Sequence, residues 1–242
     1  MRPWLESERS LERLNARSES RNIATESGRP IRFVPPGAKD AYYEIMVYET
    51  GHVETRPDSL HDYFNALAWL AFPRTKARIN AMHAAELPRE GGRRGPLRDL
   101  LTIFDEGGAI VQCDDPGLVS LLRECHWKRL FWENRDKLQA AMRVVVVGHA
   151  VLEQALDPRP GITCKAIVVP AAADPDAAAF DWLQHRVPGD SPRILSPLPI
   201  FGFPGWHPQT ERAEFYDDAR YFRALAVKSQ PESARQPLRR RL

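Results

Sequence analysis

Cysteine is scarce in this chain, and long apolar runs are absent. The three cysteines, Cys113, Cys125 and Cys164, form no C-x-x-C pair, which excludes the zinc and redox signatures that use that spacing. A sparse, odd number of cysteines is typical of reduced thiols rather than of a disulfide scaffold. No stretch approaches the roughly 20 apolar residues that a membrane-spanning helix needs. The first residues also lack the apolar core of a secretory signal. We therefore expect a soluble, cytoplasmic protein without membrane association.

The short motifs of several large enzyme classes are missing as well. The sequence contains no GxGxxG, GxxxxGK[ST], HExxH or GxSxG pattern. Their absence argues against a simple nucleotide-dependent, zincin or α/β-hydrolase function, and it does not exclude other enzymes. The 34 basic and 32 acidic residues nearly balance, so the chain as a whole has no drive toward nucleic acid or anionic membranes. A local basic patch and the oligomeric state are left open.

The length of 242 residues fits one large domain or two small ones. Residues 1–30 are dense in Arg, Glu and Ser, and we expect a flexible N-terminal arm there, with a short helix as the alternative. We expect a single globular domain over residues 31–226. Residues 227–242 end in a run of three arginines and are expected to be a disordered basic tail.

Three segments favour β-structure. Residues 42–55 are rich in β-formers around Gly51 and predict a β-hairpin. Two apolar runs, 100–104 and 109–113, flank Gly107 and Gly108 and predict a second hairpin. Residues 144–147 and 162–169 predict two strands joined by a helix over 150–156, which implies a parallel pair with a right-handed crossover.

Helices are expected between and after these strands. Asp58 or Ser59 can cap a helix over 60–71, where Leu60, Phe64, Leu67 and Ala71 form an apolar stripe. Residues 196–206 are too rich in Pro and Gly for regular structure and are expected to lie extended across the surface. The other expected helices cover 75–85, 116–132, 177–184 and 211–226. The predicted fold class is α+β, a small mixed sheet with two β-hairpins and one β-α-β unit, packed by about five or six helices.

Polar side chains recur on two of these helices. His61 and Asn65 share one helical face, near Arg56 and Asp62. The next helix places Lys76, Asn80 and His83 along one line. If the two faces converge, they form a site for a divalent metal or a phosphate-bearing ligand. The alternative is that His61 and Asn65 only tie their helix to the hairpin, while Lys76 and His83 face water.

Two further groups of residues are candidates for chemistry. The first group precedes Gly107 and Gly108 and comprises Arg98, Asp99, Thr102, Asp105 and Glu106. The adjacent carboxylates of Asp105 and Glu106 suit metal binding or action as a general base. The alternative is that they only form a turn.

His149 follows a predicted strand and opens a helix, with Glu153 one turn further on. Ligands of open α/β sheets bind beyond the carboxyl ends of strands, which favours His149 as a ligand or base and Glu153 as its orienting partner. The alternative is a helix-capping histidine.

A cluster of aromatic and basic residues raises the possibility of base stacking beside phosphate contacts. It comprises Trp127, Lys128, Arg129, Phe131, Trp132 and Arg135. At helical spacing, however, Trp127 and Phe131 are more often core residues.

Four blocks of sequence resemble one known family. They are TRPDSLHDYFNALAWLAFPRTK at 55–76, RDLLTIFDEGG at 98–108, GHAVLE at 148–153 and PLPIFGFPGW at 197–206. These blocks resemble, in the same order, a bacterial family catalogued as domain of unknown function 3025. The resemblance covers roughly residues 42–206 and implies no activity. The polar positions that it matches are Arg56, His61, Asp62, Asn65, Lys76, Asp99, Thr102, Asp105, Glu106 and His149.

The resulting hypothesis is a metal-assisted hydrolase acting on an anionic substrate such as a phosphodiester. We expect the catalytic residues to be His61, His149 and Asp105, and the metal ligands to be Asp105, Glu106 and His149. The expected substrate-binding residues are Arg56, Asn65, Lys76 and Thr102. The rival hypothesis is a non-catalytic binding or adaptor protein, in which the same residues form a structural hydrogen-bond network and the 197–206 segment docks a partner.

Overall fold

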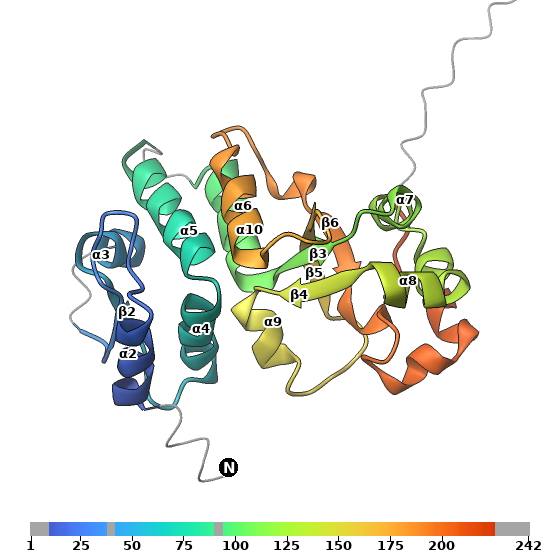
Figure 1. Ribbon diagram of the computed structural model, residues 1–242, viewed down its shortest axis with the longest axis horizontal. Coiled ribbons are helices and arrows are strands. Elements are labelled where there is room, and N and C mark those ends of the chain that lie inside the picture. Colours follow the sequence, from blue (N-terminus) through green and yellow to red (C-terminus); the bar gives the residue numbers. More distant parts are fainter. Residues whose placement is uncertain (1–9, 38–41, 90–93, 226–242) are drawn as a thin grey trace, which may run out of the picture.

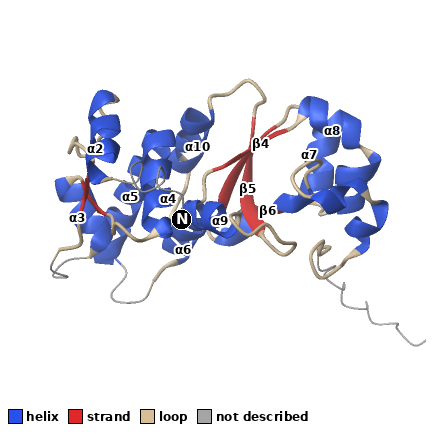
Figure 2. Ribbon diagram, turned by 90° about the horizontal axis from the view of Figure 1, so that it is seen from below, coloured by secondary structure: helices blue, strands red, loops and turns tan. Residues whose placement is uncertain are grey.

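The computed structural model describes residues 10–37, 42–89 and 94–225. A four-stranded sheet lies near the middle of the molecule (Figures 1 and 2). Helices α2 to α6 and α10 lie toward one end, and α7 and α8 lie toward the other. This arrangement confirms the expected α+β class.

Nine α-helices lie in the described ranges, more than the expected five or six. They are α2 (Leu11–Ser20), α3 (Tyr43–Thr50), α4 (Leu60–Ala71), α5 (Pro73–Glu86), α6 (Pro96–Gly107), α7 (Pro116–Arg123), α8 (Arg135–Ala141), α9 (His149–Gln154) and α10 (Pro175–Gln184). A π-helical turn covers Arg129–Glu133, and short 3₁₀ turns cover Leu87–Arg89, Pro192–Ile194, Ile200–Gly202, Pro208–Glu211 and Ala213–Asp217. The helices expected over 60–71, 75–85 and 177–184 are confirmed.

The strands form two sheets. They are β1 (Arg32–Val34), β2 (His52–Glu54), β3 (Gly108–Gln112), β4 (Arg143–Val146), β5 (Thr163–Val169) and β6 (Ser196–Pro199). β1 and β2 pair in parallel, and the larger sheet has the order β4-β3-β5-β6. β3 is antiparallel to β4 and parallel to β5, and every residue of β3 is buried.

The expected parallel pair over 144–147 and 162–169 is wrong. Both strands form, but β3 lies between them, and β4 runs antiparallel to β3 whereas β5 runs parallel to it. The parallel crossover therefore joins β3 to β5. Because β3 carries the most completely buried side chains of the sheet, it takes a central position.

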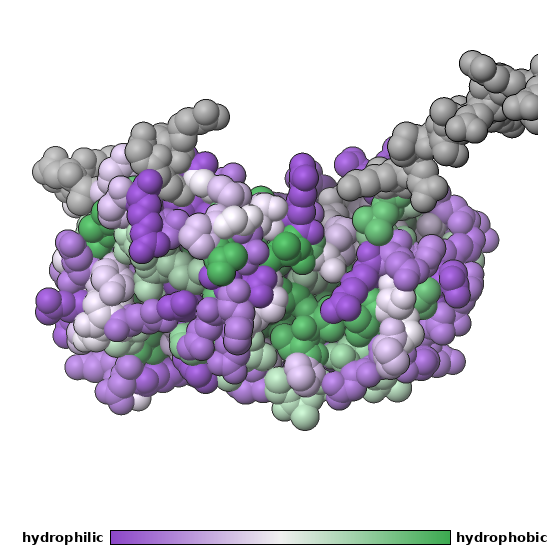
Figure 3. Space-filling view, turned by 90° about the horizontal axis from the view of Figure 1, so that it is seen from above, coloured by the Kyte–Doolittle hydropathy of each residue, from purple (hydrophilic) through white to green (hydrophobic). Residues whose placement is uncertain are grey.

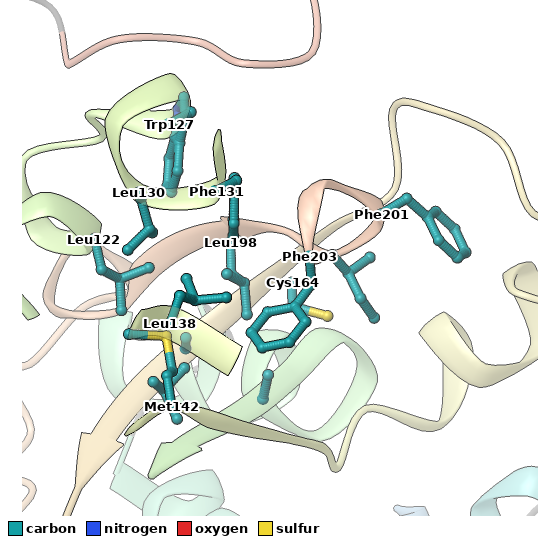
Figure 4. Packing of buried hydrophobic residues seen from close by; sticks show 14 of the residues in the cluster. Leu122, Trp127, Leu130, Phe131, Leu138, Met142, Cys164, Leu198, Phe201 and Phe203 are labelled. Atoms are coloured by element: carbon teal, nitrogen blue, oxygen red, sulfur yellow. The ribbon is translucent and has the colours of Figure 1, made fainter. Parts of the chain in front are cut away.

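Each face of the larger sheet covers its own hydrophobic cluster. Ala109 and Val111 of β3 point into a cluster with α7, α8 and the C-terminal segment, whereas Ile110 points into one with α5, α6 and α10. This alternation follows from the two-residue period of a strand. In the first cluster Trp127 and Phe131 stack at 5.8 Å between ring centroids, and Figure 4 shows them beside Leu130 and Leu198.

A third hydrophobic cluster holds the N-terminal part of the chain together. Leu14 of α2 and Ile23 are buried there against Phe33, Val53 and Trp69. The expectation of a flexible arm is therefore wrong for residues 10–30, because α2 has an apolar side to bury and Ser10 caps it. Residues 1–9 and the expected tail at 227–242 lie outside the described residues.

The hairpin expected over 42–55 is absent from the described residues of that segment. Tyr43–Thr50 is helix α3, and β2 pairs with β1. Gly51 adopts a φ of 75° and ends the helix instead of turning a hairpin. A Cβ at Gly51 would lie 2.1 Å from the Pro30 carbonyl oxygen, so this close packing also requires glycine.

The second expected hairpin is also wrong. Residues 96–107 form helix α6, and only Gly108–Gln112 is a strand. Leu97, Leu100, Leu101 and Phe104 are all buried at helical spacing, and Pro96 occupies the first turn. The Asp105–Glu106 pair thus lies at the end of a helix and not in a turn between strands.

The C-terminal part is less helical and more buried than expected. Residues 211–225 contain only 3₁₀ turns and bends, so the long final helix is wrong for the described residues. Residues 196–199 form edge strand β6, and Leu198, Ile200 and Phe201 are buried. This segment packs inside the molecule because its apolar side chains outweigh its proline content. Only Trp206, 38% exposed, keeps a sizeable apolar surface there.

Two observations concern the surface. No helix in the described part of the chain has the length and apolar character needed to cross a bilayer. The face seen in Figure 3 is largely hydrophilic, with hydrophobic side chains gathered near its middle.

Candidate functional site

A cavity of about 460 Å³ lies where five helices meet, between the N-terminal helices and the sheet. Its wall consists mainly of polar and titratable side chains. The lining residues are Pro36, Tyr43, Glu44, Glu54, Arg56, His61, Asp62, Asn65, His83, Thr102, Asp105, Glu106 and His149. Residues that are far apart in the sequence therefore meet at one solvent-reachable place.

Glycine allows the two helices beside the sheet to approach each other. The N–H groups of Val147 and Gly148 both donate to the Gly108 carbonyl, at 3.0 and 2.9 Å. A Cβ on Gly148 would lie 2.6 Å from the Glu106 carbonyl oxygen and from Gly107 Cα, so only glycine fits. This contact sets the start of α9, and with it His149, beside the end of α6, which carries Glu106.

Helix α4 supplies the other side of the site. The Ser59 side chain accepts from the Asp62 N–H and fixes the start of α4. α4 and α9 run side by side (Figure 1) and are in contact. Their packing places His61, in the first turn of α4, against His149 and Glu153.

The two histidines meet through the same ring atom. His61 Nε2 lies 3.2 Å from His149 Nε2, and the rings are edge-to-face with centroids 4.6 Å apart. Two imidazole nitrogens bound to one tetrahedral zinc ion would be roughly 3.3 Å apart, given Zn–N bonds of about 2.0–2.1 Å. The observed separation matches that value.

The opposite nitrogen of each ring faces a carboxylate. His61 Nδ1 lies 3.1 Å from Glu153 Oε2, and His149 Nδ1 lies 3.8 Å from Asp105 Oδ2. His149 Nδ1 is buried and has no hydrogen-bond partner among the described residues. Carboxylates favour a proton on both Nδ1 atoms, which leaves both Nε2 lone pairs facing each other. Such an arrangement can hold a cation between the two rings.

Glu106 completes a set of three donors. One ligand atom each from His61, Glu106 and His149 lies within 4.8 Å of the other two. A side-chain movement on the order of 1 Å would bring the Glu106 carboxylate to bonding distance of an ion held by the two histidines. Two imidazoles and one carboxylate, with a cavity on the open side, are the donor set of several catalytic metal sites.

Asp105 is engaged elsewhere. Its Oδ1 accepts a 2.5 Å hydrogen bond from Lys76 Nζ, which also donates to Asn65 Oδ1 at 2.8 Å. Lys76 is 4% exposed. Asp105 therefore neutralises a buried ammonium and faces His149, and it lies outside the donor group of His61, Glu106 and His149.

The electrostatics of this group follow from burial and charge. Burial by itself raises the pKa of Asp105, but Lys76 and His149 outweigh it and hold that pKa below its usual range. Burial lowers the pKa of His149 to about 4, reinforced by Lys76 and His61 and opposed by Asp105. A neutral imidazole, which is the form that binds metal, is thereby favoured at His149.

The remaining expected substrate-binding residues have protein partners. Arg56 Nε and Nη2 donate to the two Asp62 oxygens at 2.7 and 2.9 Å, and this pair lowers the pKa of Asp62 to about 2. The Arg56 side chain is nevertheless 63% exposed at the cavity. The Thr102 hydroxyl accepts a hydrogen bond from Arg94.

Helix α3 lines part of the cavity with Tyr43 and Glu44, two residues that the sequence did not identify as candidates. Glu44 Oε2 accepts from Asn80 Nδ2 at 2.7 Å, and burial raises the pKa of Glu44. Asn65 Nδ2 donates to the Tyr43 hydroxyl at 3.4 Å, and burial raises the pKa of Tyr43. Both residues were assigned to a strand, so nothing in the pattern directed them to this cavity.

The expected line of polar residues on α5 does converge with α4. Lys76, Asn80 and His83 are all buried, so the alternative in which Lys76 and His83 face water is wrong.

The aromatic and basic cluster at residues 127–135 contributes to the hydrophobic core and to surface ion pairs. Trp127 and Phe131 are buried core residues, and Lys128 pairs with Asp217. Arg135 pairs with Glu211. The structure therefore agrees with the alternative that Trp127 and Phe131 are core residues.

Comparisons with known proteins give a family without an assigned activity. The family described as "Protein of unknown function (DUF3025)" matches residues 31–226. Neither curated proteins nor solved structures gave a match to this chain. Since the matched range covers most of the 242 residues, the chain belongs to the DUF3025 family.

Proposed function

We propose that this protein is a metal-assisted hydrolase whose metal ligands are His61, Glu106 and His149. The observation that carries the proposal is the 3.2 Å approach of the two Nε2 atoms, with carboxylates behind both rings. Carboxylate–histidine–metal arrangements of this kind orient ligands in known metal sites. Glu106 replaces Asp105 in the ligand set because Lys76 already engages Asp105.

The donor set suits catalysis more than a structural role. Structural zinc sites use four protein ligands, whereas catalytic sites use three and leave a position for water or substrate. A divalent ion held here supplies a water of lowered pKa for attack on an ester, amide or phosphoryl group. Glu106 would contribute one negative charge to a bound divalent ion and imidazole ligands would contribute none, so a net positive charge would remain to polarise the substrate.

The cations around the site limit the substrate. Of the two expected to neutralise an anionic substrate, Lys76 is engaged by Asp105, and only Arg56 remains exposed at the cavity. Five carboxyl side chains line the same cavity: Glu44, Glu54, Asp62, Asp105 and Glu106. Substrates with one negative charge, such as a phosphodiester, or with none, fit this balance better than highly charged ones.

Metal binding tests the proposal directly. Chelator-treated protein should take up one Zn²⁺ per chain by titration calorimetry, and His61→Ala, Glu106→Gln and His149→Ala should each abolish or greatly weaken that uptake. His126→Ala is the matched control, because His126 pairs with Glu124 at 3.1 Å on the surface, away from the cavity. The zinc form should then hydrolyse p-nitrophenyl acetate or bis(p-nitrophenyl) phosphate, and the ligand variants should not.

Two results would contradict the proposal. Failure of the wild-type protein to bind any first-row divalent ion would remove the metal. Selective binding of Fe²⁺ with consumption of O₂ would assign the same two-histidine, one-carboxylate set to oxygenase chemistry instead.

The rival hypothesis of a non-catalytic binding protein has less support. It requires the polar residues to satisfy one another in a sealed core, whereas these residues border a cavity. The 197–206 segment, proposed as its docking surface, is largely buried.

A further inference from the structure

His83 is a titratable residue in the cavity wall that the metal site does not use. It lies on α5, two turns beyond Lys76, and is 3% exposed. It lines the same cavity as His61, Glu106 and His149.

A neighbouring guanidinium fixes the tautomer of His83. Arg98 Nε donates to His83 Nδ1 at 3.3 Å. A guanidinium has no acceptor, so Nδ1 must hold the lone pair and Nε2 must carry the proton of the neutral ring. Burial keeps the ring neutral by lowering its pKa to about 4; Arg98, Arg94 and Lys76 add to this effect, and Asp105 opposes it.

The N–H at Nε2 has no hydrogen-bond acceptor among the described residues. The Nε2 atom is also not completely enclosed by protein, in contrast to the unpartnered Nδ1 atom of His149. Since His83 lines the cavity, this N–H opens into it. A buried donor that is oriented by one partner and unmatched on the other side is ready for a ligand oxygen.

We propose that the Nε2–H of His83 donates a hydrogen bond to the substrate, at the carbonyl or phosphoryl oxygen of the group that is cleaved. This inference rests on the proposed hydrolase function and names a residue of the same cavity that binds the reacting group. A fixed neutral donor stabilises the charge that develops on this oxygen, and it needs no reorganisation during the reaction. A cationic imidazole would be drawn to the carboxylates of the wall, whereas a neutral one stays available.

The first part of the test needs neither metal nor substrate. Long-range ¹H–¹⁵N spectra of the full-length protein should show His83 as the neutral Nε2–H tautomer at pH 6, where a free histidine is largely protonated. Arg98→Met should weaken this tautomer preference. A cationic His83 at pH 6, or a neutral ring protonated at Nδ1, would overturn the inference.

The second part uses acetohydroxamate, which binds zinc and presents oxygen acceptors. His83→Leu should weaken acetohydroxamate binding to the zinc form by roughly tenfold or more, the loss expected for one buried hydrogen bond. His83→Gln, whose amide nitrogen lies near the position of Nε2, should restore most of the affinity. Zinc affinity should be the same in all three proteins.

The outcomes separate this inference from the proposed function. If His83→Leu binds acetohydroxamate as tightly as the wild type does, or if it loses zinc, the proposed role of His83 is wrong. Failure of the wild type to bind zinc would contradict the metal site, while the tautomer spectra would still decide the state of His83.

Discussion

Lys76 Nζ lies 2.5 Å from Asp105 Oδ1, and under the proposed function this ion pair decides which carboxylate is free for a metal. Asp105 and Glu106 are adjacent in sequence, and either would suit a divalent ion. On a helix, adjacent side chains point about 100° apart, so they meet different partners. Asp105 is paired with the ammonium of Lys76 on α5, whereas a carboxylate oxygen of Glu106 lies within 4.8 Å of a ring nitrogen of each of the two histidines.

The ion pair should be sensitive to loss of one partner. Lys76→Met leaves the carboxylate of Asp105 buried without its counter-ion and should lower the free energy of unfolding by about 3–5 kcal/mol, measured with urea. Adding Asp105→Leu should recover most of this loss, because both charges are then gone. Lys128→Met is the control: its partner Asp217 is exposed, so a change below about 1 kcal/mol is expected. A similar small effect in Lys76→Met would show that Asp105 is not held by this contact.

The Arg56–Asp62 pair should make stability depend on acid. Asp62 has a folded pKa of about 2, below the usual 3.8, so its contribution is present above about pH 4 and is lost as the pH falls toward 2. The shift corresponds to roughly 2 kcal/mol, and because the Arg56 side chain is 63% exposed we expect about 1 kcal/mol. Asp62→Asn should flatten the stability curve between pH 4 and 2 in urea titrations. Asp217→Asn, at the exposed pair with Lys128, is the control and should leave the curve between pH 4 and 2 nearly unchanged.

The sequence predicted helix α4 and its site residues well. Ser59 as cap, the apolar stripe and the shared face of His61 and Asn65 are all local properties, and they need no tertiary information. The sequence alone does not show whether α5 packs against this face of α4. In the structure it does, and Lys76 of α5 donates a hydrogen bond to Asn65 of α4.

The failures have two physical sources. The segments that form α3 and α6 are rich in residues common in strands, but tertiary packing determines that they are helices. Val47 in α3 and the apolar stripe from Leu97 to Phe104 in α6 are buried on one helical face. The strand order also lay beyond the sequence, because nothing local shows that β3 separates β4 from β5. Whether Asp105 or Glu106 is the proposed ligand depends on the helical state of α6 and on the tertiary arrangement around it, and neither could be predicted from the local sequence.

Gly148 should be essential for bringing Glu106 and His149 together. Gly148→Ala places a Cβ 2.6 Å from the Glu106 carbonyl oxygen and from Gly107 Cα, so α9 must move away from α6. We expect a loss of roughly 1–3 kcal/mol in stability and weaker zinc binding, measured by urea unfolding and calorimetry. Gly189→Ala is the matched control, since nothing lies within 4 Å of its Cβ. Unchanged zinc affinity in Gly148→Ala would argue against Glu106 and His149 sharing a metal.

Glu153 should control metal affinity without touching the metal. Its carboxylate accepts from His61 Nδ1 at 3.1 Å, which holds the ring so that Nε2 points at His149. Glu153→Gln replaces the anionic acceptor with a neutral amide of the same size, so His61 becomes a weaker and less oriented ligand. Loss of such a partner lowers metal affinity by about 10–100-fold, and calorimetric zinc titration should show this while urea unfolding of the metal-free protein changes little.

Glu124→Gln provides the comparison, because Glu124 makes a His–Glu pair of the same 3.1 Å length with His126 outside the cavity. Its zinc affinity should equal that of the wild type. If Glu153→Gln also equals the wild type, His61 does not bind the metal through Nε2, and the pair of facing Nε2 atoms must be held together by a shared proton instead.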